Sequence, residues 1–302
     1  MLELTCNNIG EENEHAEPSL LAILDSLAQS KKIRRLDASF ARFLKQQGAD
    51  DKIACLGAVT SFALGQGHSC FPLAWLTKES LLGRELCQLV GDVLLPFDLE
   101  PDQHFISTGE IASPLVIEHH SVYLYRYYHY ERTLAQRLLA LTANIDVDLS
   151  KLHRDLDQIF PTVDASTETD WQKLAAYVAL THQLAVISGG PGTGKTTTVI
   201  KLLALLIGQL GSSDEPIIKL TAPTGKAAAR LSESISAALV RMNLPQPLQQ
   251  AIPSEASTLH RLLGVIPNSH EFRHNASNPL HLDVLVVDEA SMVDLPLMSR
   301  LL

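Results

Sequence analysis

Residues 187–199 read ISGGPGTGKTTTV, and this stretch decides the fold of the second half of the chain. Gly189, four further residues and Gly194-Lys195-Thr196 satisfy the pattern G-x-x-x-x-G-K-[ST]. Glycines let successive backbone N–H groups converge on phosphate oxygens, and a helix that begins near Lys195 adds the positive end of its dipole. The apolar run LAVIS at 184–188 predicts a strand before the loop. The stretch therefore predicts a phosphate-binding loop rather than a plain glycine–proline turn.

The loop carries the groups that hold a nucleoside triphosphate with its metal ion. Lys195 would reach the β- and γ-phosphates as a point charge and act in catalysis, and the Thr196 hydroxyl would bind Mg²⁺. The loop residues expected to contact ATP are Gly189, Gly190, Pro191, Gly192, Thr193, Gly194, Lys195, Thr196 and Thr197.

A second motif lies in the run HLDVLVVDEASM at 281–292, where four apolar residues end in Asp288-Glu289. A strand that ends in an acidic residue beside a phosphate loop gives Mg²⁺ its second anchor, and Asp288 fits that role. Glu289 would orient and deprotonate the attacking water. An Asp-Glu pair after a strand is a weak signal alone, but after a complete phosphate loop it predicts ATP hydrolysis.

From Trp171 onward, short apolar runs alternate with helical segments. The runs LAVIS, IIKLTA at 217–222 and LDVLVV at 282–287 show no period-two alternation, which is typical of strands buried on both faces of a parallel sheet. Helices are predicted over 197–210 and 225–242. The pattern predicts an α/β fold in which a P-loop domain with a parallel sheet follows a mainly helical domain.

The N-terminal half shows helical spacing. Over 19–93 the pattern predicts helices, with apolar positions at Leu20, Ile23, Leu24 and Leu27 and again at Leu36, Phe40, Phe43 and Leu44. A proline-containing stretch at 96–114 indicates a boundary.

The run PLVIEHHSVYLYRYYHY at 114–130 predicts a β-hairpin with strands at 115–117 and 122–128 and a turn at 119–121. Five of the six tyrosines lie between 123 and 130. They suit a half-buried hairpin, and a base-stacking platform is the alternative. We divide the chain into a mainly helical domain at 1–112, a hairpin and helical lead-in at 113–165, and a P-loop domain at 166–302.

Length, apolar runs and net charge narrow the classes of protein to which this chain can belong. The 302 residues suit about two domains, and no apolar run reaches the ~18 residues of a membrane span. Net charge is −10, with 14 basic against 25 acidic residues over 1–170 and 10 against 9 over 171–302. Any nucleic-acid contact is therefore expected in the second part, and the acidic first part suits protein binding or a structural role.

The N-terminus is acidic and polar, so it is not a signal peptide, and we expect a cytoplasmic protein without membrane partners. The four cysteines, Cys6, Cys55, Cys70 and Cys87, form no C-x-x-C pair, which favours reduced thiols. The run HEFRH at 270–274 matches a zinc-protease signature, but prolines on both sides leave no room for the helix that this chemistry needs.

Four stretches in order narrow the kind of ATPase. They are Trp171-Gln172, LTAPTGKAAARL at 220–231, ASTLHRLLG at 256–264 and DEAS at 288–291. In this order they resemble the superfamily 1B DNA helicases, and 171–302 looks like the RecD family, the alpha subunits of exodeoxyribonuclease V. The segment at 114–131 is also similar to RecD proteins.

The resemblance implies roles for further residues. Gln172 would read the adenine edge, and the single-stranded DNA path would be contacted by Pro223, Thr224, Lys226, Thr258 and His260. These contacts would be mostly to phosphate and sugar, so they track a strand without reading its sequence. A solvated lysine at a helix start is the alternative for Lys226, and a packing histidine for His260.

The resemblance implies an ATP- and Mg²⁺-dependent 5′-to-3′ helicase with a RecA-like motor, acting on DNA ends beside two larger subunits of a RecBCD-type complex. A P-loop kinase or non-translocating ATPase, and a subunit-assembly module, are the alternatives. The arginine that reaches the γ-phosphate across the cleft has no candidate within 1–302. We therefore expect an N-terminal fragment that is not a complete motor.

Overall fold

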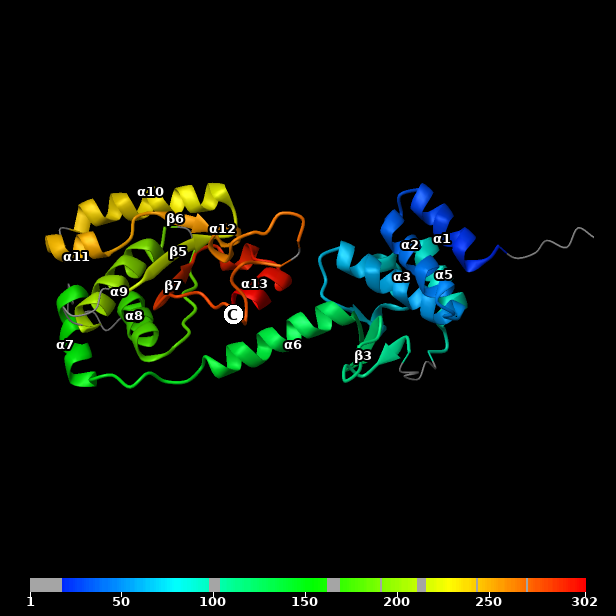
Figure 1. Cartoon of the computed structure of the whole chain (residues 1–302), viewed down its shortest axis with the longest axis horizontal. Coiled ribbons are helices and arrows are strands. Elements are labelled where there is room, and N and C mark those ends of the chain that lie inside the picture. The colour runs from blue at the N-terminus through cyan, green and yellow to red at the C-terminus, as the bar shows by residue number, and fades with distance from the viewer. Residues whose placement is uncertain are drawn as a thin grey trace, which may run out of the picture. The chain divides into compact units, whose positions relative to one another are not determined.

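The computed structural model describes residues 18–97, 104–161, 169–190, 192–210, 216–242, 244–269 and 271–302. The chain separates into two compact units, Met1–His129 and Tyr130–Leu302, and the boundary lies inside a helix (Figure 1). The domain borders predicted after residues 112 and 165 stay predictions. Each unit is described by itself.

The first unit joins a helical layer to a small sheet. Its elements are α1 (Leu20–Gln29), α2 (Arg35–Gln46), α3 (Asp51–Gly65), β1 (Phe71–Pro72), η1 (Leu73–Trp75), α4 (Glu79–Leu82), α5 (Arg84–Leu94), β2 (Ile106–Ser107), β3 (Leu115–Glu118) and β4 (Ser121–Leu124). The sheet has the order β1-β4-β3-β2, with β3 and β4 antiparallel and β2 parallel to β3. The mainly helical character predicted for this region is confirmed.

Helix α3 forms the centre of this unit, because it is apolar on nearly every face. Asp50 caps its start by accepting a hydrogen bond of 2.8 Å from the Ile53 N–H. Eleven consecutive residues, 53–63, are buried against the neighbouring helices and the sheet. Burial raises the pKa of the Cys55 thiol to about 12, so this group behaves as a small apolar core residue.

The hairpin forms as predicted, but its second strand is shorter than expected. β3 and β4 pair through a turn at His119 and His120, which both have left-handed backbone angles (φ 47° and 58°). Helix α6 (Tyr125–Ala140) begins where the strand was expected to continue to residue 128, so the predicted strand at 125–128 is wrong. The strand preference of tyrosine depends on its neighbours, and a helical course buries Tyr128 to 3% exposure.

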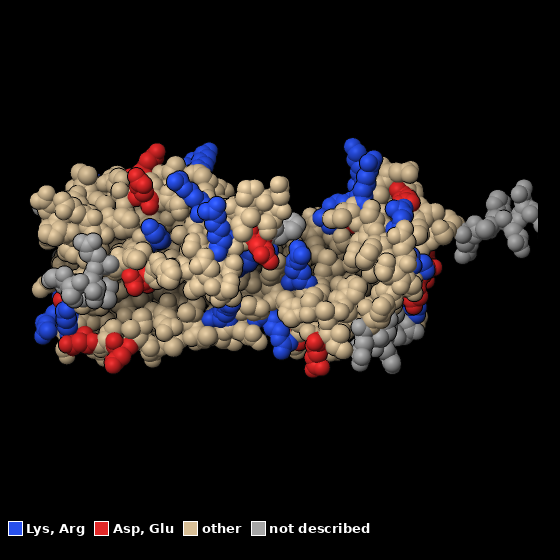
Figure 2. Space-filling model, viewed as in Figure 1, with Lys and Arg blue, Asp and Glu red and all other residues tan. Residues whose placement is uncertain are grey.

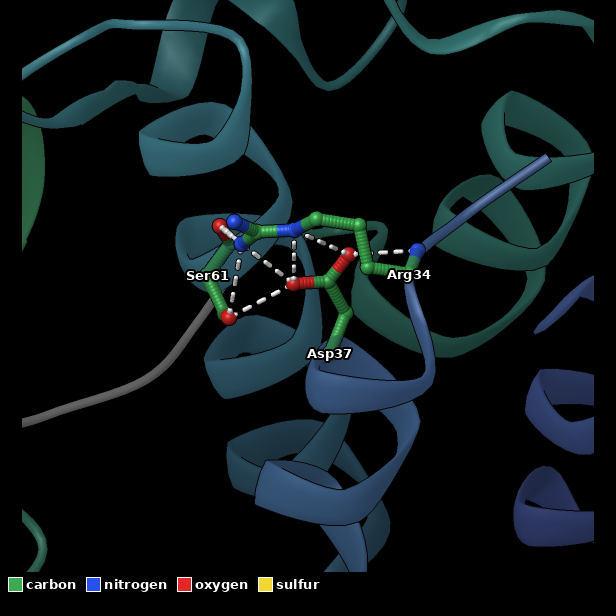
Figure 3. Close-up of polar contacts among 3 residues, drawn as sticks. All are labelled: Arg34, Asp37 and Ser61. Carbon is green, nitrogen blue, oxygen red and sulfur yellow. Dashed lines mark hydrogen bonds and ion pairs between the residues drawn. The ribbon is translucent and has the colours of Figure 1, made fainter. Parts of the chain in front are cut away.

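A buried carboxylate joins α2 to α3 (Figure 3). Asp37 is fully buried, and its oxygens accept hydrogen bonds from the Arg34 backbone at 2.9 Å, the Arg34 guanidinium at 2.7 Å and the Ser61 hydroxyl at 2.6 Å. A side chain on Gly65 would meet the guanidinium, since a Cβ there would lie 2.3 Å from Arg34 Cζ. The start of α2 is therefore fixed on α3 by charge-assisted hydrogen bonds.

Replacing Asp37 by Asn should destabilise the first unit by about 1.5–3 kcal/mol, because the amide loses the charge-assisted bonds while the site remains buried. Urea unfolding followed by a probe in this unit measures the change. The control is Glu79→Gln, since Glu79 pairs with Arg84 at the surface. Equal losses in the two variants would contradict the role given to Asp37.

The second unit contains α6 from Tyr130 onward and a layer of helices around a parallel sheet. Its further elements are α7 (Leu149–Ile159), α8 (Trp171–Thr181), α9 (Lys195–Leu210), β5 (Ile218–Ala222), α10 (Gly225–Met242), α11 (Gln246–Ala251), β6 (Ala256–Thr258), α12 (Leu259–Leu263), β7 (Val284–Val287), η2 (Ala290–Met292) and α13 (Leu295–Leu301). All three strands are parallel, in the order β6-β5-β7. In the described parts of the chain, none of the helices is long and apolar enough to cross a membrane.

Two helices pack on this sheet and close its core (Figure 1). Ile200 and Leu203 of α9 and Ile235 of α10 are fully buried in one cluster with the apolar side chains of β5. On the far side of α9, a second cluster joins Leu152 and Leu156 of α7 to α8. The predicted α/β architecture with a parallel sheet is confirmed.

The strand predicted at 184–188 is not formed. This segment takes part in no ladder, and Val186 is 85% exposed. β7 pairs with β5 on one edge, and among the described residues no strand pairs with its other edge. An apolar run becomes a strand only where a neighbouring strand accepts its backbone hydrogen bonds, and composition cannot supply that neighbour.

Candidate nucleotide-binding site

The glycine-rich loop leads directly into α9. Gly192 (φ 76°) and Gly194 (φ 83°) adopt the left-handed backbone that favours glycine. The Lys195 ammonium donates hydrogen bonds to the carbonyl oxygens of Gly189 at 2.6 Å and Gly190 at 2.9 Å. The cation therefore lies over the loop, at the start of the helix, where an anion would meet both charge and dipole. Pro191 lies outside the described residues.

Gln172 lies against the same loop. Its position near the start of α8 is fixed by Asp170, which accepts a hydrogen bond of 3.0 Å from the Gln172 N–H. The Gln172 side-chain amide donates to the Thr193 carbonyl oxygen at 3.1 Å. A Cβ on Gly194 would lie 2.6 Å from this amide nitrogen, so a side chain there would displace the Gln172 amide from the loop. The residue expected to read adenine and the loop expected to bind phosphate are thus neighbours.

A cavity of about 560 Å³ adjoins the loop, within the size range of small-molecule sites. One wall is residues 192–197, and α10 supplies Glu233, Ser234 and Arg241 among the rest. Sequence reasoning missed these α10 residues. Their signal is spacing, because positions 233, 237 and 241 are four residues apart and therefore share one face of the predicted helix.

The two carboxylates lie at the end of β7. The Asp288 N–H donates to the Thr221 carbonyl oxygen at 2.8 Å, and the buried Thr221 hydroxyl donates to the Val286 carbonyl oxygen at 3.0 Å. Asp288 is half-buried. Glu289 is exposed and has a left-handed backbone (φ 51°), which is uncommon for a residue other than glycine.

The structure does not bring these carboxylates into the cavity beside the phosphate loop, whose lining includes neither of them. The reason is the segment at 184–188. It connects α8 to the loop, and it forms no ladder with β7. The position of the loop relative to the carboxyl end of β7 is therefore not fixed by strand pairing.

The residues predicted to lie along a DNA strand do come together. Ala222 and Thr258 are partners in the parallel pairing of β5 with β6, so Pro223 and Thr224 follow one strand where Thr258 ends the next. The Thr224 hydroxyl accepts a hydrogen bond from the Ala227 N–H and caps α10, which carries Lys226 in its first turn. Thr258 caps α12 in the same way.

These groups lie at one edge of the sheet together with Asp288, because Thr221 pairs with Val287. Ligands of open parallel sheets bind at the carboxyl ends of the strands. His260 is exposed on α12 and stands edge-on to the Phe272 ring, with the centroids 5.9 Å apart. Its ring is therefore positioned by packing while it faces solvent.

The zinc-protease pattern has no helix to support it. His270 lies outside the described residues, and Glu271–His274 follow an irregular course with an isolated bridge between Val265 and Phe272. The described cysteines, Cys55, Cys70 and Cys87, are free thiols.

A phosphate loop that opens a helix beside a parallel sheet defines the class of the second unit, and a family model described as an AAA domain matches residues 172–302. A second model, described as the N-terminal domain of RecBCD enzyme subunit RecD, matches residues 29–123. With these two matches in this order, the chain is similar to RecD proteins over most of its length.

Curated relatives agree with both matches. The chain is 35% identical to RecBCD enzyme subunit RecD of Haemophilus influenzae over 94% of this chain and 48% of that protein. It is 39% identical to the protein of the same name from Mycolicibacterium smegmatis over 75% of this chain and 42% of that protein. It is also 44% identical to ATP-dependent RecD2 DNA helicase of Deinococcus radiodurans over 40% of this chain and 14% of that protein. The chain spans about half the length of the RecD relatives it matches.

Proposed function

We propose that this chain is the ATP-binding part of a DNA helicase subunit that moves 5′ to 3′ on single-stranded DNA in a RecBCD-type complex. The observation that carries the proposal is the contact of Gln172 with the loop that contains Lys195. It joins an amide that can read a base edge to a loop that can hold phosphates. The names of the relatives support the assignment to a helicase subunit.

The residues present fit a nucleoside triphosphate with Mg²⁺. The backbone N–H groups of the non-proline residues of the loop and the Lys195 ammonium would hold the phosphates, and the Thr196 hydroxyl and the Asp288 carboxylate would hold the ion. Bound ATP supplies the phosphoanhydride bond whose hydrolysis drives movement. Glu289 would take the proton of the attacking water. Asp288 and Glu289 reach the loop only if the segment at 184–188 lies along the carboxyl end of the sheet.

The adjacent ends of β5 and β6 support the proposed strand path. Thr224, Thr258 and the ammonium of Lys226 offer hydroxyl and cationic contacts at one sheet edge, and α10 directs its N-terminal dipole there. Because none of these groups selects a base, we expect binding to be independent of DNA sequence. The acidic first unit is proposed to bind partner subunits, two larger ones in a RecBCD-type complex.

Replacing Lys226 by Gln should weaken binding of an oligothymidylate by the full-length protein and lower the salt slope of log K by about one, since one phosphate contact is lost. The matched control is Lys219→Gln, because Lys219 is exposed near the amino end of β5, away from the carboxyl ends of the strands. Fluorescence anisotropy over a salt series measures the affinity and the salt slope of each variant. An unchanged slope in the Lys226 variant would mean that Lys226 is only a solvated helix-start lysine.

ATP hydrolysis by the full-length protein, with and without oligothymidylate, separates the helicase from the alternatives. A translocating motor should be strongly stimulated by the strand, whereas a kinase or non-translocating ATPase should not. Unwinding of a duplex with a 5′ overhang, compared with a 3′ overhang, then tests the direction. Hydrolysis that DNA leaves unchanged would contradict the proposal.

A further inference from the structure

Arg300 of α13 lies between two aromatic rings. Its guanidinium carbon is 5.5 Å from the centroid of the Tyr130 ring and 5.5 Å from that of Phe272, and its Nη2 donates a hydrogen bond of 2.9 Å to the Tyr130 hydroxyl. All three residues belong to the second unit. A planar guanidinium can stack on rings and donate at its edge at the same time, which an ammonium cannot do. The contact with Arg300 therefore helps to fix the position of the Phe272 ring.

Phe272 also contacts His260 of α12. The two rings stand edge to face at 5.9 Å. The chain reaches this position by turning back at Gly264 (φ 74°), after which the Arg273 N–H donates to the Gly264 carbonyl oxygen at 2.8 Å. The segment after α12 is therefore folded back on α12 itself, and Arg300 contacts Phe272 in this segment.

Beneath this surface, a small apolar cluster joins the strand path to the carboxylates. Leu259 and Leu263 of α12 and Leu297 of α13 are buried together, at 0%, 1% and 7% exposure. Val287, the residue before Asp288, packs against the same cluster, as does Phe272. Figure 1 shows α12, α13 and the end of β7 side by side in this part of the unit. A shift of α12 cannot occur without a response from α13 or β7, because packed interiors have few voids.

We infer that Arg300 is a positioning residue that couples DNA binding at α12 to the nucleotide site. A strand against Thr258 and His260 would fix α12, and the Phe272–Arg300–Tyr130 stack would prevent α12 from moving independently of α13. The cluster of Leu259, Leu297 and Val287 then passes the constraint to Asp288 and Glu289. Arg300 touches neither ligand in this scheme, and its effect is on the coupling between them. The inference rests on the proposed function.

The coupling is measurable as a ratio of affinities, which separates it from a simple loss of binding. The affinity of the full-length protein for a fluorescent oligothymidylate is determined with Mg²⁺ alone and with Mg²⁺ plus a non-hydrolysable ATP analogue. In the wild type the two values should differ several-fold. In Arg300→Gln the ratio should fall about 3-fold toward one, while ATP hydrolysis without DNA stays at the wild-type rate.

Three further variants make the result specific. Phe272→Leu keeps the apolar volume but removes the ring, so it should reduce the ratio as Arg300→Gln does, and the double variant should be no worse than either single one. Arg300→Lys should retain less than half of the logarithm of the wild-type affinity ratio. Arg154→Gln changes an exposed arginine on α7 and should leave the ratio unchanged. Thermal melting verifies that each variant is folded.

The outcomes distinguish this inference from the proposed function. If the wild type does not bind oligothymidylate, the proposed function fails. If the wild type binds and shows a nucleotide-dependent ratio that Arg300→Gln retains, the inference is overturned and the function stands. A variant that binds DNA equally weakly in both states, with the ratio intact, would make Arg300 a merely structural residue and would also overturn the inference.

Discussion

Replacing Lys195 by Gln in the full-length protein should reduce ATP hydrolysis by at least about 10²-fold and leave the fold intact. The lysine supplies the full positive charge of the phosphate loop, and that charge would act where the phosphates are shielded from water. In the structure the ammonium bonds to two loop carbonyls, so it is already held beside the position that a phosphate would take. Glutamine can donate to those carbonyls, but it carries no charge for the transferred phosphate.

A coupled assay of phosphate release measures the change, and melting curves establish that the variant is folded. Lys201→Gln is the matched control, because Lys201 lies on the same helix and its ammonium nitrogen is 4.2 Å from the centroid of the Phe160 ring, in a cation–π contact. Turnover near the wild-type rate in the Lys195 variant would remove the phosphate-loop assignment and with it the proposed function.

The carboxylates at the end of β7 should respond differently to removal of their charge. Glu289→Gln should retain nucleotide binding and lose hydrolysis by about 10²–10⁴-fold, as expected for a general base. Asp288→Asn should instead raise the Mg²⁺ concentration needed for activity, since it weakens a ligand to the ion. The amides preserve shape, so the left-handed backbone at Glu289 (φ 51°) stays equally accessible to the variant.

Nucleotide binding, titrated with a fluorescent ATP analogue over a Mg²⁺ series, and turnover at saturating Mg²⁺ separate the two roles. Glu255→Gln serves as the control, because Glu255 is an exposed loop carboxylate before β6. If the variants of Asp288 and Glu289 matched each other in binding, Mg²⁺ dependence and turnover, the division of roles between them would be wrong.

Local chemistry explains why much of the second unit could be predicted. Gly192 and Gly194 adopt left-handed backbone angles that favour glycine, and this requirement is visible in one short segment of sequence. The strands β5 and β7 are rich in apolar residues, and the helices α9 and α10 carry apolar residues at helical spacing, on two sides of α9 and on one side of α10, so these patterns are also local.

The two wrong strand predictions, at 184–188 and 125–128, have one cause. The run at 184–188 is as apolar as β7, and the tyrosines at 125–128 favour strands, yet neither segment forms one. A strand needs a partner from elsewhere in the chain, and the pairing energy depends on that partner rather than on the run itself. A helix satisfies its backbone hydrogen bonds internally, which explains why α9 and α10 were predicted more reliably than strands.

The sequence by itself determined the glycine-rich loop with its lysine, the acidic pair after an apolar strand, and the helices that follow the loop and β5, because each depends on residues close together in the chain. Only the tertiary structure decided which groups meet. It paired Ala222 with Thr258 in the β5–β6 ladder, brought Gln172 to the loop, and set Arg300 against both Tyr130 and Phe272. Those contacts join residues 21 to 170 positions apart, from the Gln172–Thr193 hydrogen bond at 21 to the Arg300–Tyr130 hydrogen bond at 170. Periodicity does not encode such contacts, because they arise only when separate elements pack around a shared core.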